Sequence, residues 1–439
     1  MLRAAQVPEA TVDHRSSSRP GGLNLAQGIA LYVGAVLGTG VLALPGLASG
    51  QAGPASLVAW SALVLMSVPL ASTFAVLASR YPDAGGVSTY ARLAFGDRAS
   101  TIVGWWFYLG APVGIPALAF FGSAYLERST GGGWAATAGY AGALLLFGFG
   151  ANAFGVRVSG KIQLVLSAGL AILLVLAVVV ALPKAHVATL HPFAPHGWSA
   201  VVSVGALLVW AFTGWETVTH LSAEFAHPQR DVKRATAGAL LAIGVLYLSL
   251  AAVTVLALGA QAGSESGGSS TSLASLLQLG LGGAGPTIAS VVAVLTTLGT
   301  MNAYIASTAK LGAALARDGS LPGRLGKGVE AGGVPRRSLA VVATVSGGVF
   351  VVTAVTRLSV EPLVLSTTAC FASVYAVGAA AGIRLLRHKS RSGLVSAVAA
   401  LGVVVILLCL TGRYVGWPIV LAFAALGWCA RRTSALRSR

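Results

Sequence analysis

Val36-Leu37-Gly38-Thr39-Gly40-Val41 lies near the middle of the first apolar segment, with Pro45 about one turn later. Glycine costs roughly 1 kcal/mol in a helix interior, so two glycines spaced by one residue favour local unwinding. Inside a bilayer, an unwound segment persists where its free backbone groups find partners or line a cavity. Free N–H groups at one half-helix and free carbonyls at the other match the carboxylate and ammonium of an amino acid. Close helix packing through small residues is the alternative, and the motif alone favours it.

A second interrupted segment, Trp210-Ala211-Phe212-Thr213-Gly214-Trp215-Glu216, changes this balance. Breaks at corresponding positions of two halves of a membrane protein are the best sequence indication of a transporter site. Glu216 is the main ionisable residue deep in an apolar span, where an acid is costly unless it is paired or protonated. It is therefore either a proton-coupling residue or a structural acid hydrogen-bonded to neighbouring backbone.

The composition indicates an integral membrane protein. Hydrophobic residues make up 56% of the 439 residues and charged residues only 9%, with a mean hydropathy of +0.81. Soluble domains carry roughly 25% charged residues, so this chain cannot cover a water-facing surface. Because about 20 apolar residues cross the hydrocarbon core, twelve spans are predicted: two within 20–79, then 99–126, 133–151, 162–182, 199–222, 235–259, 285–313, 338–356, 362–383, 393–412 and 414–430.

The positive charges predict the orientation. With both termini in the cytoplasm, 24 of the 29 Lys and Arg residues fall on the cytoplasmic side. The exceptions are Arg128, Lys184, Arg357 and Arg413 outside, and Lys310 within a span. Although the net charge is +17, these residues sit in short gaps between spans and form no continuous face, so a nucleic-acid partner is not expected. Residues 1–22 and 432–439 are predicted to be cytoplasmic tails.

The remaining motifs argue against an enzyme. No metal-ligand spacing, P-loop or nucleophile–base pair occurs, and no cofactor or ATP-binding domain is expected. Two outer loops, 185–198 with three histidines and the Gly/Ser-rich 260–284, are interpreted as solvated connectors. The three cysteines are interpreted as small buried hydrophobes.

The predicted eighth span contributes Thr300-Met301-Asn302-Ala303-Tyr304 near mid-membrane. Met301 could line a pocket for an apolar side chain, and it is equally compatible with ordinary core packing. Ser307 and Thr308 could supply oxygens to a sodium ion, but hydrogen bonds between helices are the favoured reading.

Several of these segments resemble the amino acid–polyamine–organocation (APC) superfamily of permeases. The matching pieces are Leu25-Ala26-Gln27-Gly28-Ile29, the Gly38-Thr39-Gly40 break, Tyr81-Pro82-Asp83-Ala84-Gly85-Gly86-Val87, the 210–216 segment and 223–231. Within the superfamily, the likeness is greatest to bacterial exporters of L-methionine and branched-chain amino acids.

The resemblance implies an all-α fold of two inverted five-helix repeats with broken helices 1 and 6, plus two extra helices. The repeats would cover about 23–182 and 199–385, and the extra helices about 393–431, within a transporter domain spanning 23–431. It also implies that the breaks hold the substrate, through Gly38, Thr39, Gly40, Trp210, Phe212, Thr213 and Gly214, with Trp210 as a gate. Some proton-coupled members use a lysine in span 5, where this chain has Leu170. Proton coupling would then rest on Glu216, or transport would be uncoupled exchange.

The sequence thus predicts a multi-pass plasma-membrane transporter of amino acids, exporting methionine and branched-chain amino acids by proton antiport. A proton-coupled importer and an amino acid exchanger remain as alternatives. A channel, a membrane enzyme and a nutrient receptor are less favoured because the chain lacks a continuous polar lining, clustered acids or histidines, and a signalling extension.

Overall fold

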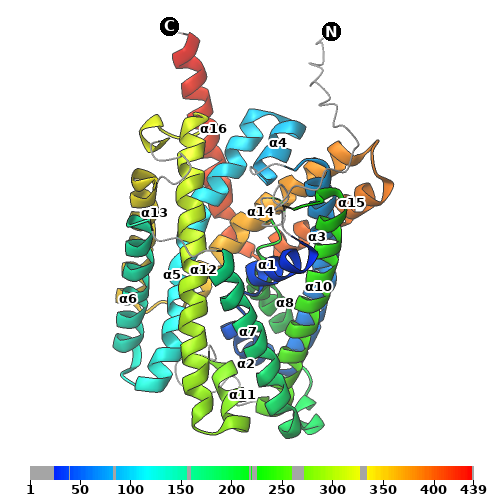
Figure 1. Cartoon of the computed structure of the whole chain (residues 1–439), viewed down its shortest axis with the longest axis vertical. Coiled ribbons are helices and arrows are strands. Elements are labelled where there is room, and N and C mark those ends of the chain that lie inside the picture. Colours follow the sequence, from blue (N-terminus) through cyan, green and yellow to red (C-terminus); the bar gives the residue numbers. More distant parts are fainter. Residues whose placement is uncertain are drawn as a thin grey trace.

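The computed structural model describes residues 24–38, 40–82, 86–155, 160–216, 219, 225–259, 271–326 and 334–437. Every regular element within these ranges is helical (Figure 1). In chain order they are α1 (Leu25–Leu37), α2 (Gly40–Ala52), η1 (Gly53–Ala55), α3 (Ser56–Arg80), α4 (Val87–Phe95), α5 (Asp97–Thr130), α6 (Gly133–Ala153), α7 (Gly160–Ala181), η2 (Leu182–Lys184), η3 (Val187–Leu190), α8 (Gly197–Leu208), η4 (Val209–Phe212), α10 (Pro228–Val253), η6 (Thr254–Leu258), α11 (Ser272–Leu281), α12 (Ala284–Arg317), η8 (Gly323–Gly326), α13 (Arg336–Thr356), α14 (Glu361–Leu386), α15 (Arg391–Leu410), η9 (Gly412–Val415) and α16 (Gly416–Arg437).

Ten helices in the described ranges are long and apolar enough to cross a membrane. This supports the predicted multi-pass membrane protein but is fewer than the twelve spans expected. The difference lies at the predicted first and sixth spans: α1 has 13 residues, α8 has 12, and α2 is continuous with α3 in the single candidate Gly40–Arg80. A straight helix of 12 or 13 residues falls short of the roughly 30 Å hydrocarbon core.

Local sequence signals explain where these helices start. The side chain of Asn24 accepts a hydrogen bond from the Gln27 N–H, and the Gln27 side chain accepts one from the Asn24 N–H, so α1 begins with a capping box. Pro228 occupies the first turn of α10, where its missing N–H costs nothing.

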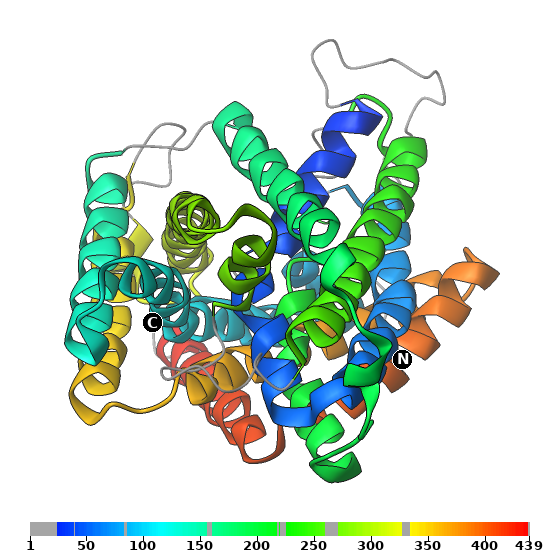
Figure 2. The ribbon, with the colours of Figure 1, turned by 90° about the horizontal axis from the view of Figure 1, so that it is seen from below.

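The longest helices form the support for the rest. α5 and α12 have 34 residues each and make the most extensive contact among the described helices. α4 and the C-terminal end of α16 lie at one end of the bundle, and α11 lies at the other (Figure 1). Seen from below, α6 and α13 are on one side and α15 is on the opposite side (Figure 2).

One outer loop departs from its prediction. Residues 260–270 lie outside the described residues, but Ser272–Leu281 forms α11, so the interpretation of the whole 260–284 segment as a solvated connector is wrong. Leu273, Leu276 and Leu277 are fully buried or nearly so. Their i, i+3, i+4 spacing gives α11 an apolar face, and this face packs onto α12 and α7.

Candidate functional site

The first break falls within the predicted segment. α1 ends at Leu37 and α2 begins at Gly40, while Thr39 lies outside the described residues. Gly38 has φ +25° and ψ −170°, a backbone conformation that side chains with a Cβ rarely adopt. Glycine at position 38 therefore allows the chain to leave the helix, and α1 ends near the middle of the predicted first span.

The second break lies directly against the first. After α8 and η4, Thr213 is extended and Gly214 has φ +115°. A Cβ added at Gly214 would lie 2.8 Å from the carbonyl oxygen of Ala35. Only glycine permits this approach, so the backbones of the two breaks touch each other.

One tyrosine hydroxyl serves carbonyls from both breaks. The Tyr247 hydroxyl, from α10, lies 3.1 Å from the Val36 oxygen and 2.9 Å from the Ala211 oxygen. A hydroxyl has a single hydrogen to donate, so the two carbonyls share it. At least one acceptor therefore keeps capacity for a further donor.

Glu216 is bound to the same region by its carboxylate. Its Oε2 accepts a hydrogen bond from the Gly214 N–H at 2.9 Å and another from the Tyr375 hydroxyl of α14. The Gly214 N–H also lies 3.1 Å from the Tyr375 oxygen, and the Glu216 side chain is 94% buried. The acid thus caps a backbone donor that the break leaves free, while Tyr375 supplies a second donor.

These hydrogen bonds match the interpretation of Glu216 as a structural acid bonded to neighbouring backbone. Its role in proton coupling stays a prediction. Tyr375 was not singled out from the sequence. The only available signal was a tyrosine in an otherwise apolar span, because the contact joins residues 159 positions apart.

A small cavity lies where the two breaks meet. Its volume is about 20 Å³, which is room for about one water molecule. No residue of its described lining carries a charge, and the lining comprises Ala35, Val36, Gly38, Gly40, Leu118, Trp210, Ala211, Thr213, Thr300 and Tyr304. This volume is too small to hold an amino acid.

Trp210 fills the space beside this cavity because two glycines make room for its indole. A Cβ at Gly40 would lie 2.8 Å from the indole Cδ1, and one at Gly114 of α5 would lie 2.7 Å from Cη2. Thr213 is held by hydrogen bonds from its hydroxyl and its N–H to the Trp210 carbonyl, at 2.8 and 3.2 Å. Trp210 therefore connects both breaks to α5.

The structure brings most of the predicted residues together at this cavity. Gly38, Gly40, Trp210 and Thr213 line it, and Gly214 lies beside it. Phe212 belongs to η4, but its side chain is outside the described part of the chain.

Met301 lies elsewhere on its helix. It is fully buried, and its Cε sits beside Gly148 of α6, whereas its neighbours Thr300 and Tyr304 line the cavity. Asn302, one residue on, accepts a hydrogen bond from Asn152 of α6 at 2.8 Å. This face of α12 contacts α6, whereas Thr300 and Tyr304, which were not singled out from the sequence, face the cavity.

No metal site is found among the described residues, including His186, His191 and His196. Leu170, at the position where some proton-coupled APC members carry a lysine, is buried in α7. Nearby, a Cβ at Gly34 of α1 would collide with the Ser167 hydroxyl, so α7 contacts α1 through this small pair.

Comparison with known proteins adds the family. The family model "Amino acid permease" matches residues 23–426. An uncharacterized amino acid permease of Bacillus subtilis, YecA, is 34% identical over 399 residues, covering 91% of this chain and 93% of the relative. The L-methionine/branched-chain amino acid exporter YjeH of Escherichia coli is 31% identical over 417 residues, covering 92% and 94%. The branched-chain amino acid permease BcaP of B. subtilis is 27% identical over about half of each chain.

The matched range contains both helix breaks, the cavity between them and Glu216. The matches with YecA and YjeH extend over almost the whole of both chains, so they concern the complete fold and no isolated motif. The chain belongs to the amino acid permease family of the APC superfamily.

Proposed function

We propose that this permease exports methionine and branched-chain amino acids across the plasma membrane by proton antiport. The observation that carries the proposal is the uncharged cavity between two helix breaks, where the carbonyls of Val36 and Ala211 share a single donor and can accept another from the ammonium of an amino acid. Its described lining offers no acid to pair with a basic side chain and no base to pair with an acidic one. The likeness to YjeH supports methionine and branched-chain amino acids as the substrates.

The proposed architecture has twelve spans, with both termini cytoplasmic and two inverted five-helix repeats. In it, α1 and α2 form one broken span, and α8 with η4 begins another. Gly38, Thr39, Gly40, Phe212, Thr213 and Gly214 hold the substrate backbone, Trp210 closes over it, and Met301 supports the side-chain pocket from behind. Alternating access arises when the broken helices rock against α5 and α12.

Glu216 is the proposed proton carrier. Protonation removes a negative charge that now accepts two hydrogen bonds, so it weakens the link between Gly214 and Tyr375. One proton moving across 100 mV supplies roughly 2.3 kcal/mol. This is enough for about a 50-fold amino acid gradient.

Flux from proteoliposomes tests the proposal. Vesicles are loaded with radiolabelled methionine, leucine or lysine and diluted into buffer that imposes an inward proton gradient or an inward sodium gradient. Methionine and leucine efflux should accelerate with the proton gradient only, and lysine should stay inside. Preferred transport of lysine, or no transport of either apolar amino acid, would contradict the proposed substrate class.

Uncoupled exchange is the second candidate, and two observations favour it. The Glu216 carboxylate already has structural partners, and α7 carries no lysine near Leu170. An exchanger would release labelled amino acid only when unlabelled amino acid is present outside, whatever the proton gradient. A symporting importer would instead show uptake accelerated by an inward proton gradient.

A further inference from the structure

A group of exposed cations lies where α14 turns into α15. Arg384, Arg387, Lys389 and Arg391 fall within eight residues of chain, and Arg80 at the end of α3 joins them. The Arg80 guanidinium donates to the Lys389 carbonyl at 2.8 Å. We call these five residues the basic loop.

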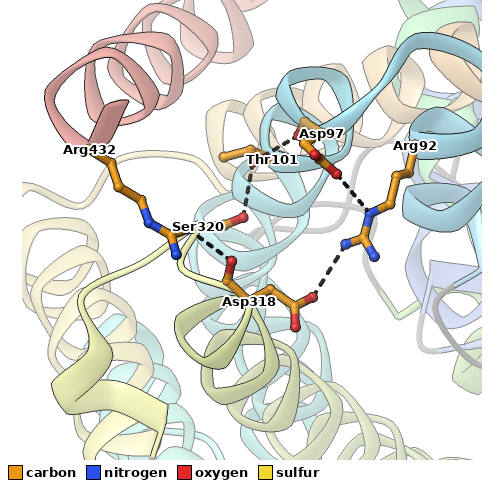
Figure 3. A network of polar contacts seen from close by, with 6 residues as sticks. All are labelled: Arg92, Asp97, Thr101, Asp318, Ser320 and Arg432. Atoms are coloured by element: carbon orange, nitrogen blue, oxygen red, sulfur yellow. Dashed lines mark hydrogen bonds and ion pairs between the residues drawn. The ribbon is translucent and has the colours of Figure 1, made fainter. Parts of the chain in front are cut away.

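Some cations at the same end of the molecule have a carboxylate partner or contact a carbonyl, which sets them apart from the basic loop. Arg92 of α4 pairs with Asp97 at 3.5 Å and with Asp318 at 3.3 Å, and Arg432 of α16 donates to the Asp318 carbonyl at 3.0 Å (Figure 3). Within the described ranges, no residue of the basic loop makes an ion pair with a carboxylate. Five positive charges therefore repel one another with no described carboxylate to compensate them.

Aromatic rings hold the loop in place without neutralising it. Lys389 lies 5.5 Å from the centre of the Tyr81 ring, and the Arg384 guanidinium lies 5.8 Å from the centre of the Phe95 ring. Such contacts attract a cation but leave its N–H donors and its charge available. The loop is thus fixed in position, and no described carboxylate uses its positive charges.

The loop also lies at a polar–apolar boundary. Val395 and Val398, one and two turns into α15, are 63% and 54% exposed, and α15 is one of the candidate membrane spans at the edge of the bundle (Figure 2). On the other side, Leu93 and Phe95 of α4 are each 44% exposed. Exposed apolar side chains immediately beside exposed cations match the level at which phospholipid phosphates meet acyl chains.

We propose that the basic loop binds the phosphate headgroups of anionic phospholipids. Arginine and lysine form charge-assisted hydrogen bonds with phosphate oxygens, and the acyl chains of the same lipid pack against α15. The site is independent of the proposed transport cavity. The proposed orientation, with both termini in the cytoplasm, places the lipid in the cytoplasmic leaflet. If these positive charges only set the orientation of the chain in the membrane, they would give the protein no preference for anionic lipids.

The test uses the full chain purified in detergent, with native mass spectrometry and thermal unfolding as the two readouts. Dioleoylphosphatidylglycerol is compared with dioleoylphosphatidylcholine and with inorganic phosphate. The wild-type chain should retain phosphatidylglycerol and be stabilised by it. Each cation removed should lower its affinity about fivefold. The combined variant Arg384→Gln, Arg387→Gln, Lys389→Gln and Arg391→Gln should lose the preference.

A matched control removes equal charge elsewhere, through Lys233→Gln, Arg234→Gln, Arg336→Gln and Arg337→Gln, and should keep the preference. The single variant Arg387→Gln covers the case in which the combined variant does not fold. The proposal is overturned if the wild-type chain binds both lipids equally, if the control loses as much affinity as the loop variant, or if inorganic phosphate stabilises the chain as well as the lipid does.

Discussion

α5 and the first broken span respond differently to helix-breaking residues. α5 contains Pro112 and Pro116 and still runs unbroken from Asp97 to Thr130, whereas the chain breaks at Gly38 with no proline in the break itself. A proline removes the N–H that would bond to the carbonyl four residues earlier, so Pro116 frees the carbonyl of Pro112. The Ser346 hydroxyl of α13 donates to that carbonyl at 2.8 Å.

At the breaks, the free groups have more adaptable partners. The carbonyls of Val36 and Ala211 share one Tyr247 hydroxyl, and the Gly214 N–H bonds to the side-chain carboxylate of Glu216. In a bilayer, the partner of a freed backbone group therefore decides its role. A fixed hydroxyl from a neighbouring helix makes a support, and a shared donor beside a cavity makes a candidate binding site.

Gly214→Ala should have the largest effect, because it separates the two breaks. The new Cβ would meet the Ala35 carbonyl at 2.8 Å and would occupy a left-handed conformation. Together these cost roughly 3 kcal/mol, so transport in proteoliposomes should fall more than about a hundredfold. Gly402→Ala in α15, where a Cβ meets open space, is the control and should be neutral. Normal transport by Gly214→Ala would show that the contact between the breaks is dispensable.

Glu216→Gln should act on coupling rather than on folding. A glutamine oxygen can still accept from the Gly214 N–H, but the side chain no longer titrates. Acceleration of efflux by a proton gradient should disappear, while exchange of labelled for unlabelled methionine persists. Tyr375→Phe, which removes only the second donor to the carboxylate, should reduce the acceleration without abolishing it. An unchanged response in Glu216→Gln would exclude Glu216 as the proton carrier.

Tyr247→Phe should expose the carbonyl acceptors of both breaks. Losing the shared donor should destabilise the ligand-free protein by about 1–2 kcal/mol, visible as a lower Tm. Because a substrate ammonium would replace the lost donor, methionine should raise the Tm of this variant more than that of the wild-type chain. A smaller rise would contradict the assignment of Val36 and Ala211 to the ammonium.

Ser346→Ala should have the smallest effect and mark the supporting role of α5. Removing the donor to the Pro112 carbonyl should lower the free energy of unfolding by about 1 kcal/mol. Amino acid flux per folded molecule should stay unchanged, since this contact lies outside the cavity lining. A tenfold loss of flux at normal stability would place Ser346 in the transport cycle and weaken the contrast with the breaks.

The break positions could be predicted from the sequence because glycine acts locally. Gly38 and Gly214 adopt positive φ where the pattern indicated unwinding. The membrane class followed from composition in the same way. The ten candidate spans, against twelve predicted, differ at the same regions, since α1 and α8 are short and α2 continues into α3.

The partners of the breaks could not be predicted, because they depend on packing between distant segments. Tyr247 and Val36 are 211 residues apart, and no pattern in an apolar helix indicates which face it presents. The same limit applies to Met301, which faces α6, while Thr300 beside it lines the cavity. The place of these residues along the chain could be predicted here, but the side of the helix that each one faces could not.

Thermal unfolding with L-leucine and two close analogues tests most directly whether the breaks bind both the carboxylate and the ammonium of an amino acid. Leucine methyl ester lacks the carboxylate, and 4-methylpentanoate lacks the ammonium, while both keep the apolar side chain. The account predicts that only L-leucine raises the Tm of the wild-type chain, and that none of the three raises the Tm of Gly214→Ala. Equal stabilisation by leucine and by either analogue would contradict it, because one of the charged groups would then contribute nothing to binding.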